Sequence, residues 1–175
     1  MAGKLLWSIW VFLLLVVFCP AELSADTQRL AVLVYHHIQQ KVTSDVSCTP
    51  EQFVEHIQGL LDNGFRPLTL AQTRRFLAGT LSVDKPVLIT FDDGYESLYH
   101  FALPVARQLK VPMTVFMITS RAGRRIQFAE YLTERQIREM AESGYFDFGS
   151  HTHDLHTDTL NIYDAFAGHP DNPVL

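Results

Sequence analysis

The chain has 175 residues, of which 47% are hydrophobic, and its net charge is −5. This length is enough for one globular domain, and the acidic balance argues against a nucleic-acid-binding protein, which needs a basic face. The only cysteines are Cys19 and Cys48, which excludes a disulfide framework and leaves the fold to depend on a packed core.

The N-terminal segment, residues 1–25, has the composition of a secretory signal peptide. Lys4 precedes an apolar stretch that runs from Leu5 to Phe18, which is short for a transmembrane span. We therefore expect an exported protein, in the periplasm, the cell envelope or outside the cell, with its domain over residues 26–175. Two alternatives stay open, an uncleaved membrane anchor and a lipoprotein signal acylated at Cys19.

Strand and helix patterns alternate along the rest of the chain. The continuous apolar run at 30–35 is typical of a strand buried on both faces of a parallel sheet. Capping residues predict helices that begin after Thr49, Thr69 and Thr133. A further helix is expected from about residue 97 to 110, in which Pro104 should introduce a kink or a new start. The other predicted strands are 65–68, 86–91, 113–118 and 145–149.

This alternation implies βα units around a parallel sheet, and hence an α/β fold. In a (β/α) barrel the catalytic residues lie at the carboxyl ends of the strands. His36 and His37 follow the first predicted strand, Asp92 and Asp93 follow the third, and a histidine-rich run begins after the fifth. We therefore expect three polar clusters, far apart in sequence, to meet on one rim.

The residue types in these clusters indicate a metal-dependent hydrolase. A carboxylate with two histidines is a common ligand set for a divalent metal and leaves positions for water and substrate. A second carboxylate beside it can act as a base on that water. His151 and His156 can share one ion only if the segment curls round it as a loop, and His153 competes as a ligand by proximity. The alternative interpretation of Asp92 and Asp93 is a solvated Asp-Asp-Gly turn.

Two motifs resemble those of the NodB-type polysaccharide deacetylases, carbohydrate esterase family four. They are Thr-Phe-Asp-Asp-Gly at 90–94 and Ser-His-Thr-His-Asp-Leu-His at 150–156. Tyr35-His36-His37, the Gly149-Ser150 approach and the histidine spacing are most similar to the poly-β-1,6-N-acetylglucosamine deacetylases of bacterial biofilm systems. The resemblance covers about residues 30–160 and implies a distorted (β/α)₇ barrel.

Carried over to this sequence, the resemblance implies a role for each residue of the site. Asp92 matches the general base, and Asp93, His151 and His156 match the metal ligands. His36 matches the general acid of the biofilm branch, with His37 as the adjacent alternative. Zinc is the first choice of metal for this ligand set, and nickel, cobalt or iron would accept it too. The implied reaction removes acetyl groups from a β-linked N-acetylglucosamine polymer.

One departure from the family pattern affects both fold and activity. The next family motif, a Pro-Tyr-Gly segment with an Arg or Trp, has no match in residues 161–175. Five strands cannot close a seven-stranded barrel, so we expect an incomplete domain with its metal site present and part of its wall absent. Open sheet edges favour association, and such a chain should have weak activity or none.

Three functions follow from these observations. The first is deacetylation of the β-1,6-linked polymer, the second is deacetylation of chitin or peptidoglycan, and the third is metal or glycan binding without turnover. Of the other polar residues, His56, His100 and His169 are expected on the surface or in packing roles, and Arg121, Arg124 and Arg125 are expected in a solvated loop.

Overall fold

The computed structural model describes residues 29–42, 44–127 and 129–155. The predicted signal peptide and His156 lie outside these ranges. In the part of the chain that is described, no helix is both long and apolar enough to cross a membrane.

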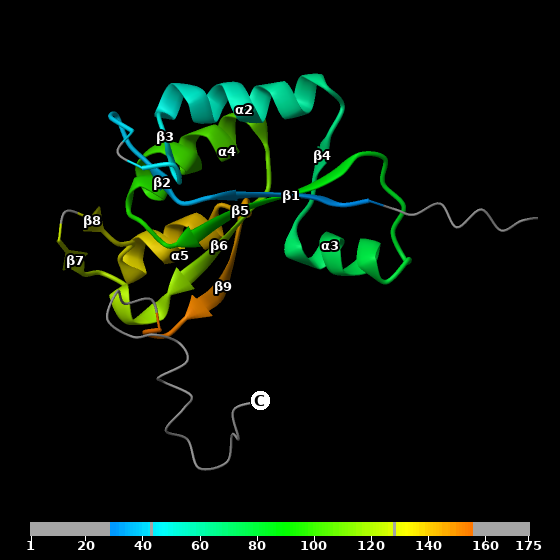
Figure 1. The fold of residues 1–175 in the computed structure, drawn as a ribbon. Helices are drawn as coiled ribbons and strands as arrows, with labels where there is room; N and C mark the ends of the chain where they lie inside the picture. The colour runs from blue at the N-terminus through cyan, green and yellow to red at the C-terminus, as the bar shows by residue number, and fades with distance from the viewer. Residues whose placement is uncertain (1–28, 43, 128, 156–175) are drawn as a thin grey trace, which may run out of the picture.

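A parallel sheet forms the centre of the molecule, as the alternating pattern predicted (Figure 1). The strands pair in the order β1-β5-β6-β9, and β4 pairs with the start of β5. Within the described residues, β1 and β9 are the edge strands of this path, so the sheet is open there; its closure into a barrel stays a prediction. The strands are β1 (Ala31–Tyr35), β4 (Arg66–Pro67), β5 (Pro86–Asp93), β6 (Met113–Ile118) and β9 (Phe146–Thr152).

Local capping signals determine where three of the helices begin. Thr49, Thr69 and Thr133 each form a capping box with the glutamine three residues later. The fourth helix restarts as expected, because a π-helical turn at Leu98–Ala102 gives way to an α-helix with Pro104 in its first turn. The helices are α2 (Pro50–Asp62), α3 (Leu70–Leu77), α4 (Leu103–Leu109) and α5 (Glu134–Glu142).

The cap of α2 can be tested directly. The Oγ1 atom of Thr49 accepts a hydrogen bond from Gln52 N at 3.2 Å, and Gln52 Oε1 accepts one from Thr49 N at 2.9 Å. Thr49→Ala is expected to lower the free energy of unfolding by about 0.5–2 kcal/mol, measured by urea denaturation. Thr49→Ser keeps the hydroxyl and should lose much less. Equal losses in the two variants would show that the methyl group, and not the cap, stabilises this end.

One face of the sheet carries the main core, covered by α2, α4 and α5. Phe53 of α2 packs in it beside Tyr35 and Phe91, and its ring meets that of Tyr35 edge to face at 5.2 Å. The prediction that the first strand is buried on both faces was wrong for the described residues. Val32 and Val34 are 53% and 55% exposed, because alternate side chains of β1 point to the opposite face, which no described element covers there.

Short paired segments surround the sheet and were not predicted. β2 (His37–Ile38) pairs with β3 (Ser47–Cys48), and β7 (Arg125–Ile126) forms a hairpin with β8 (Ala129–Glu130). Two-residue strands carry no periodicity, so sequence patterns cannot reveal them.

The last strand is longer than predicted and contains a bulge. β9 continues to Thr152, whereas the sequence pattern ended it at residue 149. Met117 pairs with Ser150, but the next residue, Ile118, pairs with Thr152, so His151 is the extra residue. The interpretation of His151 as the start of a loop is therefore corrected. A bulge changes the direction of the extra side chain, and such bulges are over-represented beside active sites.

Candidate active site

Polar residues from separate strands meet at the carboxyl edge of the sheet. Asp93 pairs with Met117 of β6, and Met117 pairs with Ser150 of β9, directly before His151. Neighbouring strands lie about 4.8 Å apart, so the backbones that carry Asp93 and His151 are about 10 Å apart. A carboxylate and an imidazole can close that gap on one shared ion. The backbones of Asp93 and His151 therefore lie on one rim of the sheet, as expected.

Asp93 occupies an unusual backbone conformation at the end of β5. Its φ is +70°, and the N–H of Gly94 donates to the Asp92 carbonyl at 2.9 Å across it. This closes a three-residue turn with a positive central φ, a rare and strained geometry. Asp93 as a residue is only 4% exposed. Strain of this kind persists where the surroundings enforce it, often at functional sites.

Gly94 is required next to this strained residue. Its φ is +82°, and a Cβ added to it would lie 3.1 Å from Met117 Cγ. Glycine alone accepts both that conformation and that close approach without cost. The Asp-Asp-Gly sequence therefore forms a buried, tightly packed turn, and the alternative interpretation as a solvated turn is wrong.

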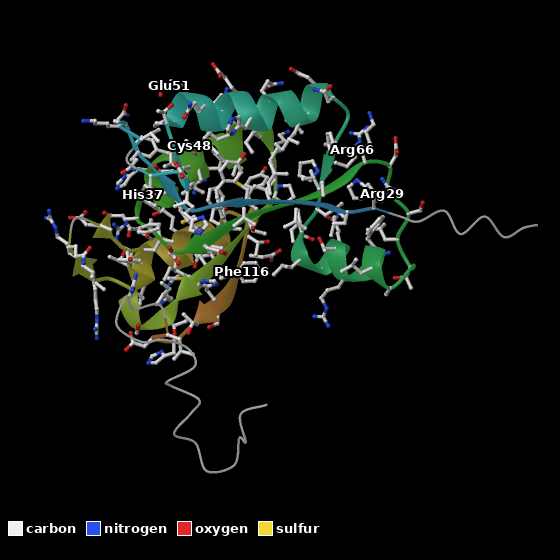
Figure 2. The ribbon with its side chains drawn as sticks, in the orientation of Figure 1. Arg29, His37, Cys48, Glu51, Arg66 and Phe116 are labelled. Atoms are coloured by element: carbon white, nitrogen blue, oxygen red, sulfur yellow. The ribbon has the colours of Figure 1, made fainter. Side chains whose placement is uncertain are left out.

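The pairing register of β1 on β5 shows that His36 and His37 lie in different surroundings. Tyr35 pairs with Phe91, so the next residues on the two strands, His36 and Asp92, reach the carboxyl edge at the same level. His37, which is labelled in Figure 2, turns away into β2. Its ring stacks on Tyr95 with centroids 4.6 Å apart and planes 9° apart. Burial lowers the pKa of His37 below its ordinary value.

His153 has partners away from the Asp93 turn. Its Nδ1 lies 2.9 Å from Thr119 Oγ1, and its carbonyl accepts a hydrogen bond from Ser120 N at 3.0 Å. Asp154 accepts another from Ser120 Oγ at 3.0 Å. The segment after His151 is thus held against the turn that follows β6.

Arg121 is not part of a solvated loop, which corrects the expectation for this residue. Its Nη1 donates to the Tyr131 hydroxyl at 2.7 Å, and its guanidinium carbon lies 5.5 Å from the centre of the Tyr131 ring. Tyr131 stacks in turn on Tyr95, with centroids 5.0 Å apart. Sequence reasoning missed both tyrosines, although Tyr95 directly follows the Asp-Asp-Gly turn.

A polar cavity of about 290 Å³ opens beside this rim. His37 lines it, together with the carboxylates of Glu96 and Glu130 and the ring of Phe101. Glu96 accepts a hydrogen bond from Gln136 Nε2 at 2.7 Å, and this bond lowers the pKa of the Glu96 carboxyl. The lining combines hydrogen-bonding groups with an aromatic ring, which suits a sugar better than an apolar ligand.

The donor set at this edge fits a divalent metal ion as far as it is described. Carboxylate and imidazole are donors that zinc accepts at about 2.0–2.2 Å, and Asp93 and His151 supply one of each. Because Asp93 is buried, its charge would act strongly on a nearby cation. The described residues contain no group of three such donors, and the third predicted ligand, His156, lies outside them.

Gly149 makes room for Phe116, which pairs with it in the sheet. Figure 2 labels the Phe116 side chain. A Cβ added at Gly149 would come within 2.9 Å of Phe116 Cδ1. Gly149→Ala is therefore expected to cost about 1–3 kcal/mol of folding stability, measured by urea denaturation.

Phe116→Leu is the matched control for this clash, because leucine is smaller than phenylalanine and has no ring. Combined with Gly149→Ala, it should recover part of the loss, so the two substitutions are expected to be non-additive. Strict additivity would show that the Phe116 ring does not limit residue 149.

The family model of the polysaccharide deacetylases matches residues 82–165. A curated relative from Staphylococcus epidermidis, a poly-β-1,6-N-acetyl-D-glucosamine N-deacetylase, is 34% identical over 117 residues, which are 66% of this chain and 40% of that protein. The chain spans less than half the length of the first curated relatives it matches.

Solved structures agree with the fold described above. IcaB from Ammonifex degensii is 35% identical with a TM-score of 0.68, over 73% of this chain and 54% of that one. A polysaccharide deacetylase from Bacillus cereus is 29% identical with a TM-score of 0.60, over 81% of this chain and 45% of that one. Residues 82–165 thus match the polysaccharide deacetylase family, and the chain is similar in sequence and fold to members of that family.

Proposed function

We propose that the protein is a metal-dependent N-deacetylase of poly-β-1,6-N-acetylglucosamine, acting on exported polymer of a biofilm matrix. The observation that carries the proposal is the convergence of Asp92, Asp93 and His151 at one edge of a parallel sheet. The printed activity of the Staphylococcus epidermidis relative supports this substrate. The polar cavity beside His37 supports a carbohydrate ligand. Closure of the sheet into the family's barrel and export through residues 1–25 belong to the same proposal.

Each residue at the edge has a distinct task in the proposed reaction. Asp93, His151 and His156 hold the metal ion, zinc being the first choice. When bound, such an ion acidifies water and polarises the amide carbonyl. The Asp92 carboxylate accepts the proton of the attacking water, and the His36 imidazolium gives a proton to the leaving amine. The products are acetate and a glucosamine unit of the polymer.

Acetate release tests this function. The full-length protein, supplied with Zn²⁺, should release acetate from β-1,6-linked N-acetylglucosamine oligomers and stop when a chelator removes the metal. Faster release from β-1,4-linked oligomers would point to chitin or peptidoglycan instead. Zn²⁺ binding without acetate release from either series would point to a non-catalytic binding role, and release unaffected by a chelator would contradict metal dependence.

The two neighbouring histidines give a matched pair of variants. His36→Gln is expected to lower the rate of acetate release by at least about 10²-fold, because glutamine cannot donate the proton. His37→Gln removes the stack on Tyr95 and changes the lining of the polar cavity, so it should lower stability and oligomer affinity, with a smaller loss of rate at saturating oligomer. Rates measured at equal folded fraction separate the two effects. A larger loss of rate for the His37 variant would move the acid role to His37.

A further inference from the structure

The polar cavity beside β2 borders the proposed catalytic residues. Its volume of about 290 Å³ is at the lower end of the range of ligand pockets, about 300–1,000 Å³, which suits a single sugar unit. His37 lines the cavity and directly follows His36, and Glu96 lines it and is three residues beyond Asp93. A polymer whose acetamide group reaches the catalytic edge would therefore bring a neighbouring sugar unit close to this cavity.

The lining of the cavity combines aromatic rings with hydrogen-bonding groups. Tyr95 covers one face of the His37 ring, with the two ring planes 9° apart, so His37 meets a ligand through its other face or its edge. Phe101 adds a second ring, and Gln39 and Ser97 add an amide and a hydroxyl group. A sugar offers C–H groups to rings and hydroxyl groups to polar side chains, and this lining matches both.

The charge of the cavity is negative. Glu96 and Glu130 line it, and no lysine or arginine is among the described residues that do so. Glu130 is exposed and paired at 3.4 Å with Arg125, which makes Glu96 the main carboxylate. Burial lowers the pKa of His37, so its ring adds little positive charge at neutral pH. The cavity therefore favours a ligand that carries a cationic group.

A buried glutamine holds the Glu96 carboxylate in place. Gln136 Oε1 accepts hydrogen bonds from Thr133 N and Thr133 Oγ1 at 2.9 and 2.8 Å, which leaves Nε2 to donate to Glu96 Oε1 at 2.7 Å. His100 Nε2 lies 3.8 Å from the same oxygen and forms an ion pair only when it is protonated. The Glu96 side chain is 24% exposed. A carboxylate that is fixed and partly desolvated binds a cation more tightly than a mobile surface carboxylate does.

The proposed reaction itself produces a matching cation. Each deacetylation converts a neutral acetamide into a primary amine, which is protonated at neutral pH. We propose that the cavity is a subsite for a glucosamine unit of the polymer, in which Glu96 binds the ammonium group and His37 lies against the sugar. The proposal rests on the proposed function, because it takes the product polymer as the ligand. It makes Glu96 a specificity-determining residue, through which one deacetylated unit helps to bind the polymer for the next deacetylation.

The test is the affinity of the full-length protein for a β-1,6-linked glucosamine trimer at pH 7, measured by isothermal titration calorimetry. This probe carries no acetyl group, so its binding does not depend on turnover. Glu96→Gln keeps an acceptor for Gln136 but removes the charge, and we expect the affinity to fall by about 10-fold or more. The KM and kcat for the fully acetylated trimer should change little.

Glu130→Gln removes the second carboxylate of the cavity. Glu130 is more exposed, so this variant should cause a smaller fall in affinity for the glucosamine trimer. Because an exposed side chain contributes little to folding, Glu130→Gln keeps the test valid even if Glu96→Gln does not fold, which its thermal midpoint reveals. Unchanged affinity in the folded variants would overturn the inference.

Glu142→Gln is the matched control. Glu142 is exposed on α5 and does not line the cavity, so this variant removes the same single charge from another part of the surface. Its affinity for the glucosamine trimer should equal that of the wild type. A fall as large as that of Glu96→Gln would show that the overall charge of the protein attracts the oligomer, and the inference would fail.

Acetate release separates this inference from the proposed function. If the wild type releases acetate from the acetylated trimer, but Glu96→Gln and Glu130→Gln bind the glucosamine trimer as the wild type does, the function stands and only the subsite fails. If no acetate is released and Glu96→Gln still weakens binding of the glucosamine trimer, the cavity binds an amine-bearing sugar and the deacetylase function fails.

Discussion

Replacing Asp92 with asparagine is expected to lower the rate of acetate release by about 10²–10⁴-fold, the usual contribution of a general base. An amide is close in size to a carboxylate but cannot take up the proton of water. Asp92 is half-buried and pairs with Phe116 in the sheet, so the replacement should leave the surrounding packing intact. Rates on β-1,6-linked oligomers and Zn²⁺ affinity are measured on the same preparations.

The control for this substitution is Asp154→Asn. Asp154 also lies at the carboxyl edge, but it is exposed and accepts a hydrogen bond from Ser120. Its rate should equal that of the wild type. An Asp92→Asn variant that is folded, binds Zn²⁺ and keeps its full rate would remove Asp92 from the role of base. A simultaneous loss of Zn²⁺ binding would instead indicate that Asp92 contacts the metal.

The helices show which parts of this fold can be predicted from sequence. Thr49 and Thr133 start helices because each threonine side chain accepts a hydrogen bond from the backbone N–H of the glutamine three residues later, and that glutamine side chain accepts one from the threonine N–H. Both bonds are local in sequence. Pro104 acts just as locally. Signals that need no distant partner are therefore read correctly from the chain alone.

The strands show where such prediction stops. The sequence pattern ended the last strand at residue 149, but pairing with β6 extends it to Thr152 and places His151 in a bulge. The two exposed valines of β1 have the same origin, because an apolar run does not reveal which faces will be covered. Both properties depend on neighbours far away in sequence, which periodicity cannot register.

The candidate site follows the same division. That Asp92, Asp93 and His151 reach one edge could be predicted, since parallel strands bring their carboxyl ends together. Which of His36 and His37 lies level with Asp92 required the register of β1 on β5. The contact of Arg121 with Tyr131 also escaped prediction, because β7 and β8 bring the two together only once the hairpin forms.

His151 of β9 and His153, just beyond the end of that strand, provide the second prediction with a large effect. His151→Ala should lower Zn²⁺ affinity, and acetate release should be lost with it. Removing a hydrogen-bond partner of a metal ligand typically costs about 10–100-fold in affinity, and removing the ligand itself should cost more. His153→Ala is the matched comparison, because its imidazole is already paired with Thr119, and its Zn²⁺ affinity should be that of the wild type. His151, and not His153, is the extra residue of the bulge opposite β6. The reverse result, with binding lost in the His153 variant and kept in the His151 variant, would show that the segment beyond Thr152 rearranges round the ion and that His153 is the ligand.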